Sequence, residues 1–418
     1  MIILLFLFIL LVIAVFYSPK SKSDRARLFY TFTITFLWNI IWLVLVQSEL
    51  IDKGIATYGS DAEYYYLQSL NAINSINPFL TALHARLAPF FVFWNTLILK
   101  TSPNLSSIWI KLSNVLFVEF ILLVIYFWLQ EKIENRSVIF NLLLIFGLNG
   151  IVTWTVLREL KDTIFVFLMI LNLFLTEHLM KRKRNFVLLV FTLCMAVIFH
   201  NLRMFAVIFP FAILVIRMIW YPKEFNKNLF ILFAAALILL FLFQYKRILW
   251  YITGFIYYSG RFREPLTILR SGVFQLLFSP FRFLIGPGPI RALLGSEIFV
   301  VTTNVGNILI FLGALEFWLI LPLILQMFIF DLRFVWKNFY YSFAPIFITL
   351  IYSIIYLGTG DTRLRATTYL LFLPLIILYV DDIYKNNRIK TIALRYLLTA
   401  AFTWAGGIVL SLLSLTKI

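Results

Sequence analysis

Residues 107–129 read SIWIKLSNVLFVEFILLVIYFWL, and this stretch decides the fold class. Lys111 and Glu119 are the only charged residues in a mostly apolar run that is long enough to cross a bilayer, which takes about 20 helical residues. The rest of the 418-residue chain has the same character, because 62% of it is apolar, 13% is charged and the mean hydropathy is +0.95. A soluble domain is about 45–50% apolar and about 25% charged. The sequence therefore predicts a single all-α polytopic membrane domain over residues 1–418.

Apolar runs of similar length predict about twelve transmembrane helices. They lie at 2–17, 29–48, 107–129, 138–156, 163–180, 186–200, 204–220, 229–244, 305–330, 340–357, 366–381 and 392–415. Residues 2–17 have no basic segment before them and no small-residue cleavage site after them, so we expect an uncleaved first span. A further apolar stretch, 88–99, is short for a span and contains Trp94 and Asn95.

Five basic loops predict how these spans are oriented, since cytoplasmic loops are enriched in Lys and Arg. They are Lys20–Arg27, Lys181–Arg184, Lys223–Lys227, Arg333–Lys337 and Lys385–Lys390. All five fall on one side only if 88–99 does not cross the membrane. We therefore expect 49–106 to be one long outer loop with an amphipathic juxtamembrane helix at 88–99, and both chain ends to lie outside. The alternative is that 88–99 is a short, tilted span and one basic loop breaks the rule.

Topology accounts for only part of the basic charge. The net charge is +17, from 36 Lys and Arg against 19 Asp and Glu, and the expected topology places 19 of the basic residues inside and 17 outside. The longest outer segment, 245–303, interleaves aromatic residues with seven of these outer bases: Lys246, Arg247, Arg261, Arg263, Arg270, Arg282 and Arg291. Such a segment suits either anchoring to lipid headgroups or binding of an anionic substrate.

The first outer loop carries a pair of acids, Asp61 and Glu63, followed directly by Tyr64. A carboxylate that is walled by tyrosine rings near the membrane surface can have a raised pKa and act as a general base on a sugar hydroxyl. Two ordinary acids in a solvated loop are the alternative. Further along, His84 fits either orientation of a substrate or a capping role at a helix end.

Further outer residues are candidates for binding phosphate. In a helical turn, Arg158, Lys161 and Asp162 would share one face, with Arg158 paired to Asp162 and Lys161 left for a ligand. Two later outer turns contain Arg203 and the run Gly358–Arg365. The candidate set for a phosphate is Arg158, Lys161, Arg203, Arg282, Arg363 and Arg365; each also fits a structural or interfacial role.

Several function classes are absent from the sequence. It has no P-loop, dinucleotide fingerprint or nucleophile elbow, and three histidines give no metal-ligand cluster. We therefore expect no metal and no cofactor. Because the basic residues belong to a membrane chain, we also expect no nucleic-acid partner.

The layout of these features resembles the GT-C superfamily of integral membrane glycosyltransferases. The resemblance rests on the early Asp61-x-Glu63 signature, the helix that opens at Pro89, the many spans and the late basic outer loop. The elements Ser279–Arg282 and Gly360–Arg365 look like those of bacterial envelope-polysaccharide polymerases.

This resemblance implies a glycosyltransferase that transfers a sugar from a polyprenyl-linked donor and inverts the configuration at the anomeric carbon. Asp61 would be the catalytic base with Glu63 supporting it, the six basic residues would bind the leaving phosphate, and Tyr64, His84 and Asp162 would orient the acceptor. The expected site is the periplasmic face of the cell membrane, among membrane lipids and partners in envelope-polysaccharide assembly. Two alternatives stay open: a repeat-unit polymerase of the O-antigen or capsule type, and a flippase for lipid-linked oligosaccharides.

Overall fold

The computed structural model describes residues 1–17, 21–222, 245–246, 249, 253, 272–286, 288–289, 304–356 and 362–415. Within these ranges the chain is all-α and contains no strand. Six helices are long and apolar enough to cross a membrane, or seven if one bent pair counts as a single span. The chain is therefore a multi-pass membrane protein.

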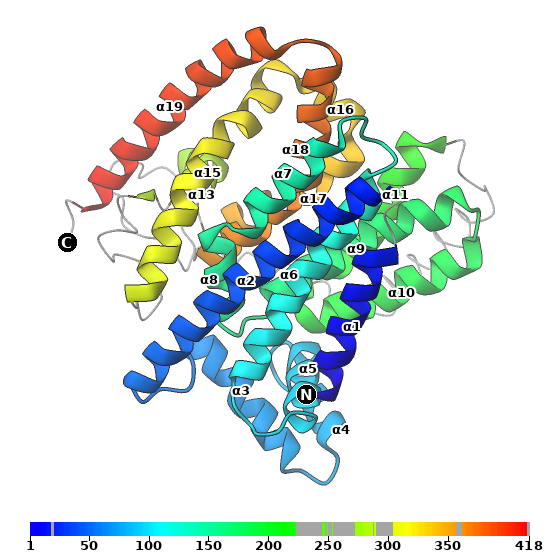
Figure 1. Ribbon diagram of the computed structural model, residues 1–418, viewed down its shortest axis with the longest axis vertical. Helices are drawn as coiled ribbons and strands as arrows, with labels where there is room; N and C mark the ends of the chain where they lie inside the picture. Colours follow the sequence, from blue (N-terminus) through cyan, green and yellow to red (C-terminus); the bar gives the residue numbers. More distant parts are fainter. Residues whose placement is uncertain are drawn as a thin grey trace.

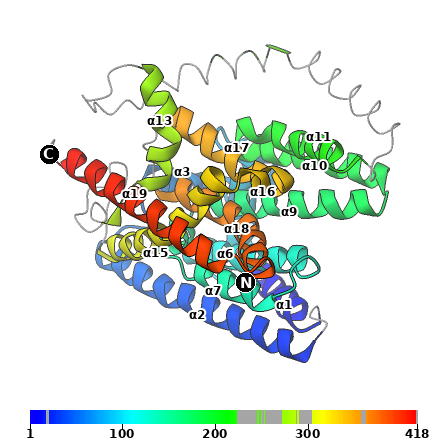
Figure 2. The ribbon, with the colours of Figure 1, turned by 90° about the horizontal axis from the view of Figure 1, so that it is seen from above.

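Most of the long helices run obliquely to the long axis of the molecule (Figure 1). Seen from above, α10 and α11 lie on one flank, and α15 and α19 lie on the other (Figure 2). The longer elements are α1 (Ile2–Tyr17), α2 (Lys22–Asp52), α6 (Ile108–Leu129), α7 (Arg136–Gly147), α8 (Gly150–Leu157), α9 (Asp162–Lys181), α10 (Asn185–Leu202), α11 (Phe209–Trp220), α15 (Asn304–Phe330), α17 (Phe339–Tyr356), α18 (Thr362–Lys385) and α19 (Ile389–Leu415). The shorter ones are α3 (Ser60–Ile73), α4 (Pro78–Leu83), α5 (Pro89–Lys100), η1 (Met204–Ile208), α13 (Gly272–Ile285) and α16 (Leu332–Lys337).

Eleven of the twelve predicted spans coincide with helices, and the remaining one, 229–244, lies outside the described residues. The number of membrane crossings stays a prediction, because α1, α10, α11 and α17 are apolar but shorter than the six long candidates.

The predicted span 138–156 is not one helix but two, α7 and α8, with a bend of 53° between them. Asn149 causes the break: its side chain accepts hydrogen bonds from the backbone N–H groups of Ile151 and Val152, which caps a new helix. Gly150 then lies against α15, where a Cβ atom would come within 2.0 Å of the Leu309 carbonyl oxygen. The sequence signal for this break was the Asn-Gly pair inside an apolar run.

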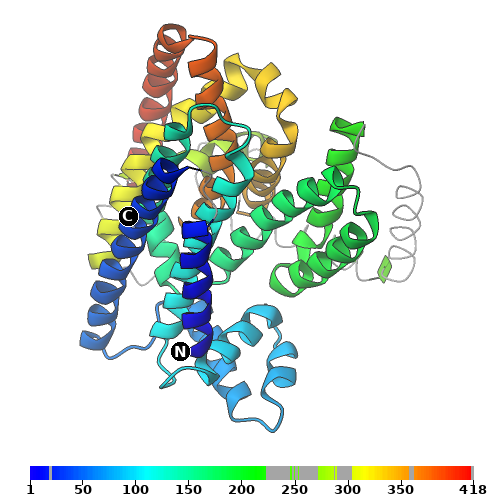
Figure 3. The same cartoon turned by 45° about the vertical axis from the view of Figure 1, so that its right-hand side comes forward.

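The segment between α2 and α6 leaves and re-enters the bundle at the same end. Lys111 on α6 donates to the Gln47 side chain on α2 at 3.2 Å, and Ser107 donates to the Ala56 carbonyl at 2.9 Å. Helices α3, α4 and α5 form a lobe at this end, which we call the lobe end (Figures 1 and 3). Residues 88–99 therefore lie within this lobe and do not run the length of the bundle. On which side of the membrane the lobe lies stays a prediction.

Within this lobe, α5 is a helix that begins at Pro89, but it is not the surface element that we expected. Its side chains Phe91, Val92, Ile98 and Leu99 are fully covered, because α5 packs against α3, α4, α6 and α10. The apolar side chains that remain exposed in the lobe belong instead to α4 and its flanks: Ile76, Phe79, Leu80, Leu83 and Leu87.

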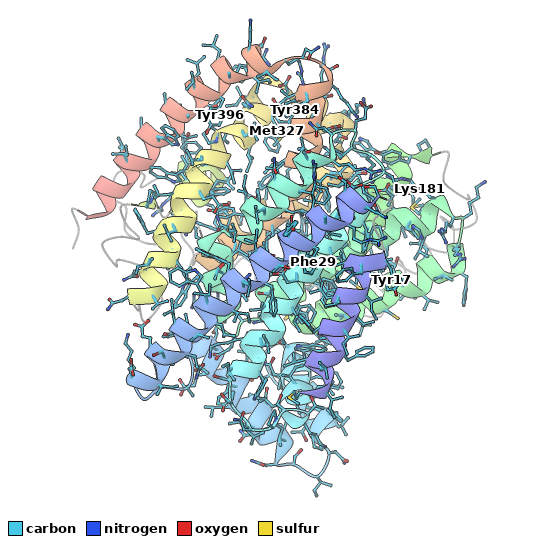
Figure 4. All side chains as sticks on the ribbon, in the orientation of Figure 1. Tyr17, Phe29, Lys181, Met327, Tyr384 and Tyr396 are labelled. Atoms are coloured by element: carbon cyan, nitrogen blue, oxygen red, sulfur yellow. The ribbon has the colours of Figure 1, made fainter. Side chains whose placement is uncertain are left out.

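The described basic loops gather at the opposite end of the bundle. Arg136 pairs with Asp24, Lys132 bonds to Glu177 at 2.8 Å, and Lys385 contacts Glu134 at 3.3 Å. Figure 4 shows Lys181 and Tyr384 in the upper half of the view, away from the lobe. The loop at 223–227 lies outside the described residues. We call this the basic end.

Candidate functional site

Asp61 lies at the lobe end, in the first turn of α3 rather than in the loop that we expected. Gly59 caps this helix with φ of +83°, a left-handed conformation that suits glycine. An acid in the first turn is favoured by the helix dipole. Arg363, in the first turn of α18, donates from Nη1 to Asp61 Oδ2 at 2.7 Å, which joins residues that are 302 positions apart.

The charge state of Asp61 differs from the expectation of a raised pKa. Partial burial pushes the pKa of Asp61 up, but the ion pair and hydrogen bond with Arg363 and the charges of Lys161 and Arg203 outweigh it, so that the pKa is lowered. The Asp61 side chain is 45% exposed. Asp61 is therefore a carboxylate at neutral pH that a substrate can reach.

The turn between α8 and α9 differs from the helical face that the spacing predicted. Glu159 has φ of +54°, which breaks the helix between Arg158 and Asp162. Asp162 therefore does not pair with Arg158; it pairs with Arg203, at the end of α10. Arg158 is buried over the Trp154 ring at 5.9 Å, and its Nη2 lies 3.8 Å from where a Cβ atom on Gly59 would stand.

A buried ion pair holds this turn in place. Glu159 pairs with Lys111 of α6, and both side chains are almost fully covered. Burial raises the pKa of Glu159, although the Lys111 charge opposes that rise. Separating the two partners would leave a buried charge uncompensated, so the pair holds Glu159 against α6. The pair thereby positions the backbone of Lys161, two residues further along.

Lys161 precedes the first residue of α9 and points toward α3. Its Nζ lies over the ring of Tyr65 at 5.3 Å, and among the described residues no carboxylate lies within ion-pair distance of it. Burial lowers the pKa of Lys161 to about 7, and the positive charges of Arg203 and Arg363 add to this effect. A negatively charged ligand would therefore stabilise the protonated form of Lys161.

We call this group the Asp61 cluster; it comprises Asp61, Tyr65, Lys161, Asp162, Arg203 and Arg363. Arg203 lies between two rings, 5.4 Å from the centroids of both Phe165 and Tyr352. Among the described residues of the cluster, three basic side chains face two carboxylates, and Lys161 adds its charge when it is protonated. Such a cluster can bind one phosphate group beside a carboxylate.

Tyr65 is the member that the sequence reasoning missed. Burial and the Asp61 charge raise the pKa of Tyr65, and its ring also packs against Phe91 at 5.2 Å. Asp61 and Tyr65 are four residues apart, so they share a face only if the segment is helical. The segment was expected to be a loop, and the signal was therefore lost.

Two of the expected acceptor residues, Tyr64 and His84, lie outside the cluster, as does Glu63, whereas the third, Asp162, belongs to it and pairs with Arg203. Glu63 is exposed, two positions beyond Asp61 on α3. The Tyr64 hydroxyl accepts a hydrogen bond from the Leu87 N–H at 3.3 Å. His84 is exposed and its Nδ1 lies 2.8 Å from the Leu80 carbonyl oxygen, which is the capping role left open by the sequence.

One candidate arginine, Arg365, serves another contact. It is buried, donates from Nε to the Phe283 carbonyl at 2.9 Å, and lies 5.5 Å from the Phe283 ring centroid. This contact attaches α13 to α18. Arg282 is half-buried on α13. Most of the predicted loop 245–303 lies outside the described residues.

Comparison with known proteins gives no relative: no family model, no curated protein and no solved structure matches the chain. Within the described residues there is also no group of three or more His, Cys, Asp or Glu side chains that could hold a metal ion.

Proposed function

We propose that the chain is a membrane glycosyltransferase that uses a polyprenyl-phosphate-linked sugar as its donor. The observation that supports this function is the Asp61 cluster, in which an accessible carboxylate lies beside three cations at one end of an apolar bundle. The transfer needs both groups. A carboxylate accepts the proton of the attacking hydroxyl, and fixed cations stabilise the negative charge that develops on the departing phosphate.

In the proposed step, the acceptor hydroxyl hydrogen-bonds to Asp61 and attacks the anomeric carbon of the donor. The bond from that carbon to the phosphate oxygen breaks on the opposite face, so the configuration inverts. Asp61 takes the hydroxyl proton, and the polyprenyl phosphate leaves with the bonding electron pair. Because the pKa of Asp61 is lowered, it accepts this proton only as the new bond forms and the hydroxyl becomes strongly acidic.

Arg363 and Lys161 have different tasks in this proposal. Arg363 holds Asp61 Oδ2 and so leaves the other oxygen for the acceptor. Lys161, which has no carboxylate within ion-pair distance among the described residues, binds the phosphate together with Arg203. The positive-inside rule places the basic end in the cytoplasm, and the Asp61 cluster therefore on the outer, periplasmic face.

A repeat-unit polymerase is the second candidate. It binds two lipid-linked substrates and would need two sets of cations. In the described part of the chain, Lys161, Arg203 and Arg363 form one cluster, whereas Arg365 is engaged with the Phe283 carbonyl. This arrangement favours transfer from a single donor.

The test is transfer of radiolabelled sugar from synthetic polyprenyl-phosphate hexoses to a lipid extract, by the purified chain in nanodiscs. Asp61→Asn should lower the rate by about 10²–10⁴-fold, the range for general bases. Asp52→Asn is the matched control, since Asp52 is an exposed acid at the same end. Equal rates for Asp61→Asn and the wild type would refute the role of Asp61. Movement of donor across vesicles without transfer would identify a flippase.

A further inference from the structure

A second charged cluster lies at the basic end, far from Asp61, around a single buried acid. Glu177 is in the last turns of α9. Its Oε1 lies 2.8 Å from Lys132 Nζ, 2.7 Å from Lys181 Nζ and 3.7 Å from Arg217 Nη2. Its Oε2 accepts hydrogen bonds from Trp128 Nε1 at 2.7 Å and from the Tyr341 hydroxyl at 3.1 Å. We call these six residues the Glu177 cluster.

Among the described residues, three basic side chains converge on the Glu177 carboxylate. Two lysines bond to the same carboxylate, and Arg217, whose side chain is 1% exposed, is a third cation beside it. Burial lowers the pKa of Lys132 to about 8; Glu177 opposes this fall, while Lys181 and Arg217 add to it. An ammonium group has three donors, so Lys181, which shares its carboxylate oxygen with Lys132, can also donate to a second anion.

The surroundings of these cations are aromatic. Lys132 Nζ lies 5.3 Å from the Trp128 ring centroid and 4.8 Å from that of Tyr341. The Arg217 guanidinium lies 3.7 Å from the Tyr221 ring centroid and 5.0 Å from that of Tyr340. Tryptophan and tyrosine concentrate where a membrane protein meets the lipid headgroups, which also carry the available phosphates.

We propose that the Glu177 cluster binds the phosphate of an anionic phospholipid. Lys181, with half of its side chain exposed, reaches the headgroup from the surface, and Lys132 lies behind it at 22% exposure. The phosphodiester oxygens would accept hydrogen bonds from Lys181, and their charge would add to that of the Glu177 carboxylate. The site joins the ends of α6, α9 and α11, so a bound lipid would tie these three helices together. The proposal is independent of the sugar transfer at the other end.

The test is native mass spectrometry of the purified full-length chain, titrated with phosphatidylglycerol or with phosphatidylcholine. We expect phosphatidylglycerol to remain bound as one tight equivalent and phosphatidylcholine to dissociate. Lys181→Gln should weaken phosphatidylglycerol about five-fold, as expected for one lysine near an anionic headgroup. Its half-exposed position makes the variant compatible with folding. The double variant Arg333→Gln/Lys337→Gln is the matched control, since it removes two exposed cations of the same end.

Three results would overturn the proposal. The first is equal retention of the two lipids by the wild type, which needs no variant. The second is equal loss of phosphatidylglycerol in Lys181→Gln and in the control, which would indicate general surface attraction. The third is displacement of phosphatidylglycerol by millimolar inorganic phosphate, which would assign the site to a soluble anion.

Discussion

Replacing Lys161 by Met should stabilise the protein and weaken its binding of donor. A lysine pKa that falls from 10.5 to about 7 means that folding destabilises the protonated side chain by at most ~5 kcal/mol, since each factor of ten is worth about 1.4 kcal/mol. The contact with Tyr65 is part of that balance, and its loss in the variant costs about 1–2 kcal/mol. We therefore expect Lys161→Met to be more stable than the wild type at pH 6, by at most about 3–4 kcal/mol.

The pH dependence follows from the direction of this pKa change. Below pH 7 the lysine is protonated in both the folded and the unfolded chain, and the full penalty applies. Between pH 7 and 10.5 the folded chain loses the proton first, so the unfolded state binds more protons and the wild type gains stability as pH rises. The advantage of Lys161→Met should be largest at pH 6 and smaller at pH 9.

The assay compares thermal unfolding in detergent at pH 6 and pH 9 with the KM for donor. Lys100→Met is the matched control, because Lys100 also lies over an aromatic ring, Phe79 at 5.2 Å, but is exposed. A gain in stability together with a raised KM is the signature of a residue kept for binding. A Lys161→Met variant that is less stable than the wild type at both pH values would refute the reasoning.

Three further predictions concern the fold. Asp162→Asn should destabilise the chain by about 3–5 kcal/mol in denaturant unfolding, because it removes the buried carboxylate that pairs with Arg203; adding Arg203→Met should restore most of the loss. Gly313→Ala should cost about 1–3 kcal/mol or more, since its Cβ would lie 2.1 Å from the Ile151 nitrogen, whereas Gly406→Ala, with 3.7 Å to Phe281, should be tolerated; similar unfolding midpoints for the two would contradict the packing. In a Cys194→Ser background, cysteines at Lys22 and Arg182 should both be labelled only from the cytoplasmic side, and labelling from opposite sides would mean that 88–99 crosses the membrane.

Much of the fold follows from apolar run length, because backbone groups in a bilayer must be paired inside helices. The break at Asn149 was not predicted, although the Asn149-Gly150 pair marks it, because the pair stands inside an apolar run and the α15 backbone that packs on Gly150 lies more than 150 positions along the chain. The candidate site could likewise be predicted only in part. Asp61, Lys161, Arg203 and Arg363 were all candidates, but the sequence could not indicate which cation meets which acid. The spacing predicted an ion pair between Asp162 and Arg158. The left-handed backbone at Glu159 separates these two residues, and Asp162 pairs with Arg203 instead.

The sequence also did not predict which lobe helix, α4 or α5, keeps its apolar side chains exposed, because this too depends on long-range packing. Residues 88–99 have the composition of a surface helix, but four neighbouring helices cover α5, and composition alone does not report what packs on a helix. The six residues of α4 are too few to stand out as a periodic pattern in the sequence.

The crossing of α8 and α15 limits the routes by which a lipid can reach Asp61. Gly150 and Gly313 bring the two backbones into direct contact, and the Asn149 side chain donates to the Gly313 carbonyl at 3.2 Å. Two helices joined without intervening side chains behave as one rigid wall, through which no hydrocarbon tail can pass. If the chain takes the prenyl-linked donor that we propose, that donor would enter between other helices, where the contacts run through side chains that can move.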